Sequence, residues 1–137
     1  MSSTFLDISS ALDSRMAGIT THPIAWENTV YVPVVGSAYL RPSILPVSSE
    51  QSGLGDSGLD EHLGIYQVDV YSESGKGRRG AELDADDVAD HFKRGTSLTY
   101  NGVVVRLGDT SRSAGIIDGD RFVISVSINY SAHVAPR

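Results

Sequence analysis

The chain contains no cysteine among its 137 residues, which excludes disulfide bonds and thiolate metal sites. It also has no long apolar run, and no basic residue precedes its first apolar residues. We therefore expect neither a signal peptide nor a membrane span. Basic residues are in the minority, and the resulting net charge of −6 argues against a general nucleic-acid binder, because binding to a phosphate backbone needs clustered lysine and arginine.

What is present is typical of one globular domain. The length suffices for one core but not for two ordinary domains, and apolar residues make up 40% of the chain. We expect a single domain spanning residues 1–137. The four histidines are widely separated, and none is combined with a serine or a carboxylate in a nucleophile motif. The sequence therefore predicts no catalytic site and no cofactor, and it favours a role in assembly.

Two helices are predicted where apolar residues recur at spacings of three and four. The first spans about residues 4–16, with an apolar arc formed by Phe5, Ile8, Leu12 and Met16. The second spans about residues 81–94, with a core side formed by Ala81, Ala85, Val88 and Phe92. Aspartates gather toward the start of the second helix, and Lys93 and Arg94 lie in its last turn, as the helix dipole favours.

Strands are predicted where apolar and polar residues alternate. Four segments show this pattern or a hairpin signal, at about residues 38–47, 61–71, 98–105 and 121–133, and a short strand is expected at 24–27. Pro42 and Pro46 lack the N–H that a central strand needs, so the first segment should lie at a sheet edge or contain a bulge. We expect residues 108–119 to form a loop. The fold class is then α+β, an antiparallel sheet of about four to five strands with two helices packed on one face.

The longest polar stretch runs from Ser48 to Asp60, between two predicted strands of one hairpin. A loop of this length in a small domain is usually functional or mobile. We interpret it as a segment that docks on a partner, and its candidate residues are Ser48, Ser49, Glu50, Gln51, Ser52, Leu54 and Asp56.

A basic turn directly precedes the acidic second helix. The turn lacks the lysine and Ser/Thr ending of a phosphate loop, so a nucleotide site is not predicted. A solvated turn and a singly exposed leucine are the simplest interpretation. Alternatively, the opposite charges pair between identical subunits arranged head to tail in a ring, with Leu83 at the centre of the contact. The candidate interface residues are Lys76, Arg78, Arg79, Leu83, Asp86, Asp87 and Asp90.

The same acidic run, together with His91, comes nearest to a metal site. Asp86 and Asp90 share one side of the helix, and Asp87 and His91 share another, so their oxygens could bind a divalent cation. A solvated helix surface explains the acidic residues better, because they favour the N-terminal half and no second cluster supplies further ligands. We predict no metal site, and a metal-dependent hydrolase is the enzyme alternative.

Four segments, taken in order, resemble the tail terminator proteins of long-tailed phages, the lambda-type terminators. They are Ile24-Ala25-Trp26-Glu27-Asn28, Tyr39-Leu40-Arg41-Pro42, the strand from Gly64 to Tyr71, and Ala89-Asp90-His91-Phe92. The resemblance covers about residues 24–107. It implies a small α+β subunit that forms a hexameric ring, caps the finished tail tube, stops tube polymerisation and offers a surface to the head.

This resemblance also implies the partners and the location. The partners would be further copies of the chain, the tail tube protein and the head–tail connector, with DNA passing through the ring without specific binding. The protein would reside in the neck region of the virion tail after assembly in the host cytoplasm, with no membrane involved. Two other interpretations are a head-completion or tail tube subunit, which also forms rings, and a monomeric binding module.

Overall fold

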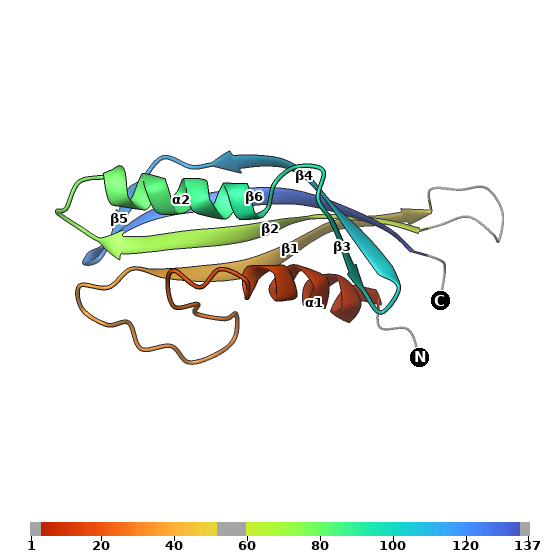
Figure 1. The fold of residues 1–137 in the computed structure, drawn as a ribbon, viewed down its shortest axis with the longest axis horizontal. Coiled ribbons are helices and arrows are strands. Elements are labelled where there is room, and N and C mark those ends of the chain that lie inside the picture. Colours follow the sequence, from red (N-terminus) through yellow and green to blue (C-terminus); the bar gives the residue numbers. More distant parts are fainter. Residues whose placement is uncertain (1–3, 52–59, 135–137) are drawn as a thin grey trace.

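Both predicted helices are present in the computed structural model, which describes residues 4–51 and 60–134 (Figure 1). Helix α1 spans Thr4–Met16, as predicted, and α2 spans Arg79–His91. Helix α2 therefore ends earlier than expected, because Phe92 leaves the helical conformation at ψ 49° while its N–H still donates to the Val88 carbonyl at 3.0 Å. Lys93 and Arg94 lie beyond the helix, and Gly95 follows at a φ of 88°.

The strands form one curled antiparallel sheet in the order β1-β2-β6-β4-β3, and β5 also pairs with β6. The fold is α+β, as predicted, but the sheet has six strands and not four or five. The strand bounds are β1 Tyr39–Gln51, β2 Asp60–Glu73, β3 Ser97–Tyr100, β4 Val103–Arg112, β5 Ile116–Asp118 and β6 Arg121–Val134.

Strand β1 confirms the prediction drawn from its prolines, since it lies at the sheet edge and its register with β2 shifts between Pro46 and Ser48. The predicted end of this strand was wrong. Residues 48–51 continue β1 and pair with β2, so only the later part of the expected polar loop lies between the two strands. The difference arises because β2 extends far enough to pair with these polar residues through backbone hydrogen bonds.

Two further expectations are corrected by the structure. Residues 108–119 are not a loop, because β4 continues to Arg112 and β5 follows at Ile116–Asp118, both hydrogen-bonded to the long strand β6. The short strand expected at residues 24–27 is reduced to a single bridge, in which Ile24 pairs with Leu40 in the parallel direction.

The core contains buried apolar residues from both helices and four of the strands, and Leu98 of β3 packs against it. Tyr66, Val68 and Val70 alternate along β2 and are fully buried, as their spacing predicted. Helix α2 contacts β2 and β6, and α1 contacts β3 and β4. The predicted core residues of α2 (Ala81, Ala85, Val88 and the following Phe92) belong to the same cluster as Ile8, Leu12 and Met16 of α1.

The two helices are tied together at their C-terminal ends. Arg15 Nε donates to the His91 carbonyl oxygen at 2.9 Å, and the Arg15 carbonyl oxygen lies 2.6 Å from His91 Nε2. These carbonyls belong to the last turns of α1 and α2, where helical partners run out, so each helix satisfies an end group of the other. Within the described residues, no helix is both long and apolar enough to cross a membrane.

Candidate interaction surface

The basic turn leads directly into α2 and is bonded to it within the same chain. Gly75 and Gly77 adopt φ values of 83° and 77°, which lets the chain reverse between β2 and α2. Arg78 Nε then lies 2.8 Å from Glu82 Oε1, one helical turn further on. An exposed pair of this kind contributes only a few tenths of a kcal/mol to stability.

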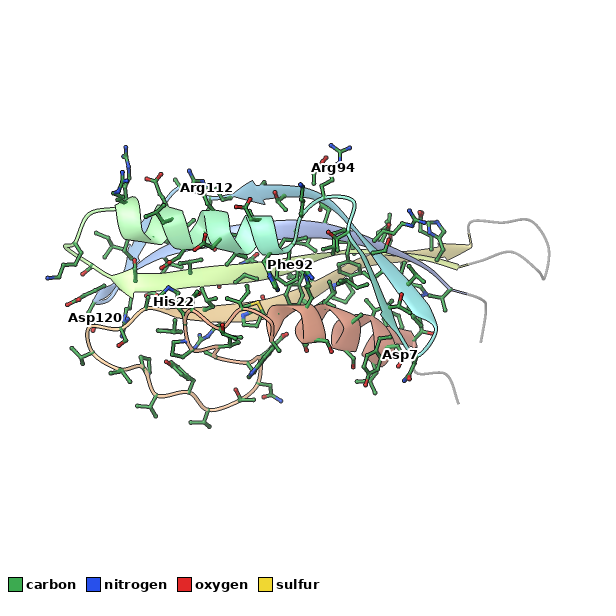
Figure 2. All side chains as sticks on the ribbon, in the orientation of Figure 1. Asp7, His22, Phe92, Arg94, Arg112 and Asp120 are labelled. Carbon is green, nitrogen blue, oxygen red and sulfur yellow. The ribbon has the colours of Figure 1, made fainter. Side chains whose placement is uncertain are left out.

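Arg112 of β4 completes a small charged cluster that the sequence analysis missed. Its guanidinium lies 3.4 Å from Glu82 Oε2 and 3.7 Å from Asp86 Oδ1, so Glu82 is flanked by two arginines. Figure 2 shows Arg112 beside α2. Arg112 is distant from α2 in sequence, and only the pairing of β4 with β6 brings it there. No local spacing could have identified it.

Leu83 is exposed, as predicted, with 53% of its surface accessible. It lines an open hollow of about 360 Å³ whose remaining lining residues are Arg78, Arg79, Glu82 and Asp86. An apolar side chain surrounded by charged ones has the composition of a contact with a hydrophobic centre and a polar rim. The structure thus brings Leu83 together with three other candidate interface residues.

Lys76, Arg79, Asp87 and Asp90 complete the predicted interface set, and all four are exposed. In the part of the chain that the structure describes, none of them forms an ion pair. Their charges are therefore not neutralised at close range by the chain's own side chains. This leaves two basic and two acidic groups available to a partner.

An apolar hollow adjoins the charged cluster at the start of α2. It has a volume of about 650 Å³ and is lined by Gly75, Gly77, Arg78, Ala114, Gly115, Ile117 and Phe122. Ile117, on β5, is 73% exposed. The hollow was not predicted, because residues 108–119 were expected to be a loop and not the strands that form it. We call it the apolar hollow below.

The acidic residues of α2 do not converge on a cation site. Asp84 Oδ1 lies 3.0 Å from His22 Nε2, and the His91 ring bonds to the Arg15 carbonyl, so both side chains already have partners outside α2. Among the described residues, no group of three or more potential ligands has the arrangement needed to hold a metal ion. The hydrolase alternative therefore gains no geometric support from these residues.

The predicted docking residues are divided by the fold. Residues 48–51 belong to the end of β1, where their backbone pairs with β2. Ser52, Leu54 and Asp56 lie outside the described residues.

Comparisons with known proteins match the sequence to one family and the fold to a solved structure. The sequence profile of a family described as "Phage tail terminator protein" matches residues 7–130. No curated protein matches the chain. A solved structure whose name states no function superposes with a TM-score of 0.73, at 26% sequence identity, over 95% of this chain and 96% of its own length.

Proposed function

This chain belongs to the phage tail terminator family, and from that premise we propose that its copies form a hexameric ring that caps the completed tail tube of a long-tailed phage. Membership of the family indicates a structural component of the tail and not an enzyme. The ring would stop further addition of tube subunits and would present the surface on which the head connector docks. Assembly would take place in the host cytoplasm.

The observation that carries the proposal is the extent of the family match. Residues 7–130 include nearly all of α1, the whole of α2 and all but the end of β6, so the match covers the core and the charged surface together. The exposed Leu83 among charged neighbours supports the assembly part of the proposal. A head-to-tail contact needs two different patches on one subunit, and the basic turn and the acidic side of α2 provide them.

A ring can stop the growth of the tail tube through the shape and charge of its surfaces, without catalysing a reaction. One side of the ring must match the end of the tube, and the opposite side must not, so that no further tube subunit finds a compatible surface. Genome DNA would pass through the opening. The net charge of −6 is compatible with this passage, because like charge opposes adhesion of the DNA to the ring.

We also propose that both helices cover one face of the sheet, which leaves the opposite face available to neighbours except near Tyr39 and Arg121, where the chain itself covers it. In support, the core cluster combines residues of both helices with Tyr66, Val68 and Val70, which share one face of β2. The opposite face of β2 carries partly exposed residues such as Gln67 and Asp69, which hydrogen-bond to each other at 2.9 Å. The segment from Ser48 to Gly58 keeps its proposed role as the part that docks on the neck.

The interface is tested by Leu83→Asp. A carboxylate at the centre of an apolar contact would be buried without a partner, so we expect a ring-sized species to be replaced by monomer in native mass spectrometry across a range of protein concentrations. Leu6→Asp is the matched control, because Leu6 is an exposed leucine on the other helix. An unchanged ring mass for Leu83→Asp would remove this residue from the interface.

The terminating role is tested in the virus. A phage that lacks this protein should make tails of variable length that are not joined to filled heads. Electron micrographs of the purified protein distinguish a terminator from a tail tube subunit, because a tube subunit should polymerise into tubes and a terminator should stop at a ring. Tails of uniform length on filled heads in the deleted phage would refute the proposed function.

A further inference from the structure

The segment before β1 presents an unusual amount of exposed apolar surface. We call residues Val30 to Val35 the valine arm. Its valines expose 96% (Val30), 78% (Val32), 60% (Val34) and 89% (Val35) of their surface, and residues 29–38 contain no charged side chain. Single exposed apolar residues are ordinary, but a contiguous group of this kind marks an interaction site.

The valine arm is nevertheless anchored to the sheet near both of its ends. Arg121, a buried residue of β6, donates from Nη2 to the Val34 carbonyl at 2.9 Å and from Nη1 to the Ser37 carbonyl. The Tyr31 ring packs against the Tyr39 ring with a centroid separation of 4.9 Å, and the Arg121 guanidinium carbon lies 5.3 Å from the Tyr39 centroid. Because the arm is held before binding, docking it would lose little conformational entropy.

The apolar hollow and the valine arm lie on opposite faces of the sheet, because Phe122, which lines the hollow, and Arg121, which anchors the arm, are consecutive residues of β6. The arm precedes β1, the edge strand on one side, whereas the hollow includes Ile117 of β5. β5 must pair with the side of β6 that faces away from β2, since β2 occupies the other side along the whole of β6. In Figure 1 the arm and β5 are at the same end of the long axis, with the arm below the sheet.

We propose that the valine arm of one copy docks in the apolar hollow of the next copy. The inference rests on the proposed ring, since an apolar projection and an apolar hollow on different faces of one subunit form a head-to-tail contact that repeats around a closed rotation. Charge agrees with this pairing. The arm is uncharged, and Arg78, the charged residue in the lining of the hollow, is already paired with Glu82, so docking leaves no unpaired charge buried.

The rims of the two surfaces are also complementary. Glu27 precedes the valine arm and is exposed, and its carboxylate accepts a 3.3 Å hydrogen bond from the Ile44 N–H. Lys76 lies between the two lining glycines of the hollow, and Arg79 follows Arg78. An acidic group beside the arm therefore meets basic groups beside the hollow, which sets the orientation of the contact.

Disulfide crosslinking tests the contact cleanly because the chain has no cysteine of its own. Two variants are made, Val32→Cys in the arm and Ile117→Cys in the hollow, both at exposed positions. Under mild oxidation, a mixture of the two variants should give a covalent dimer that neither variant gives alone. The matched control is a mixture of Val32→Cys with Leu6→Cys, which carries an exposed cysteine on α1 and should give no covalent dimer.

Each other outcome overturns the inference. A covalent dimer from Val32→Cys alone would show that the arms meet each other in a symmetric contact. No dimer in the mixture, at the highest protein concentration and with tail tubes present, would show that the arm is not in the hollow. Native mass spectrometry then separates the arm contact from the proposed function. If rings form but no crosslink is found, only the arm contact is rejected. If no rings form even when tail tubes are present, the proposed function is rejected as well.

Discussion

At the scale of single residues, Tyr66 shows how a polar group is placed within the core. Its side chain is buried beside Phe92, and its hydroxyl donates to Asp13 Oδ1 at 2.7 Å. Burial raises the pKa of Tyr66 far above its usual value, and the hydrogen bond to Asp13 and the negative charge of that residue raise it further. Burial also raises the pKa of Tyr71 and of Tyr130.

These shifts predict a loss of stability in alkaline solution. Below about pH 10 the tyrosines are neutral in both states, and above it the unfolded chain releases its phenolic protons first. The unfolded state then binds fewer protons than the native state, so the free energy of unfolding falls as pH rises. Urea unfolding at a series of pH values measures this fall.

Tyr66→Phe is the control for the alkaline effect. This variant should lose about 0.5–1.5 kcal/mol at neutral pH, because the hydroxyl bond to Asp13 disappears, and its stability should then decline less steeply above pH 10. An equally steep decline in the variant would mean that Tyr66 does not cause it.

A second prediction at this scale concerns Gly64, which pairs with Tyr130 across β2 and β6. A Cβ added at Gly64 would lie 2.3 Å from Tyr130 Oη and 2.5 Å from its Cζ, so the buried ring would have to move. We expect Gly64→Ala to destabilise the protein by about 1–3 kcal/mol in urea unfolding.

Gly80→Ala in α2 is the matched variant, because nothing lies within 4 Å of its added Cβ. Alanine in a helix should raise the stability by about 0.5–1 kcal/mol at this position. Equal effects of the two substitutions would contradict the role assigned to the Tyr130 ring.

At the scale of elements, the contact between α1 and α2 holds the C-terminal ends of the two helices together. Arg15→Met keeps most of the side-chain length but removes the donor to the His91 carbonyl at the end of α2. We expect a loss of about 1–2 kcal/mol in the free energy of unfolding, since a cation at a helix C-terminus is also favourable to the dipole. Arg94→Met removes an exposed pair with Asp109 and should change stability by less than about 0.5 kcal/mol. Similar values for both would show that the contact is no stronger than a surface ion pair.

The elements also show which parts of the fold can be predicted from sequence. Helix α1 and strand β6 were predicted nearly to their ends, because burial of one side imposes a regular spacing on their residues. Strand β5 and the second half of β4 were missed, because Ile116–Asp118 and Gly108–Arg112 carry little apolar alternation and are strands only through hydrogen bonds to β6. Pairing of this kind depends on a distant partner and leaves no local pattern.

The candidate interaction surface also combines residues that local spacing predicts with residues that only distant strand pairing places. The exposure of Leu83 followed from its angular position on α2, which local periodicity determines. Arg112 and Ile117 could not be placed, because β4 and β5 carry them to the start of α2 only through their pairing with β6. The position of the valine arm could not be predicted either, since its anchoring residue Arg121 is far away in sequence.

At the scale of the whole molecule, opposite charges remain unpaired at the start of α2 and in its second half. Lys76 and Arg79 are exposed at the start, and Asp87 and Asp90 are exposed along the helix. If these groups meet between copies, ring formation should weaken as salt rises, because exposed charges are screened over about 8–10 Å at physiological ionic strength. A contact carried only by the apolar side chains of Leu83 and the valine arm would not weaken in this way.

Charge reversal turns this expectation into a direct test. Replacing both cations (Lys76→Glu with Arg79→Glu) should place like charges opposite Asp87 and Asp90 of the neighbour and weaken the ring about tenfold or more in native mass spectrometry, equivalent to about 1.4 kcal/mol. Replacing both aspartates by lysine should weaken it similarly. The variant that carries all four changes restores opposite charges between these four positions at every contact of a closed ring. It should assemble better than either double variant, although like charges remain opposite Glu27 of the neighbour. If the fourfold variant assembles no better than either double variant, while circular dichroism shows all three folded, then these charges do not face one another and the ring must be held by the apolar surfaces alone.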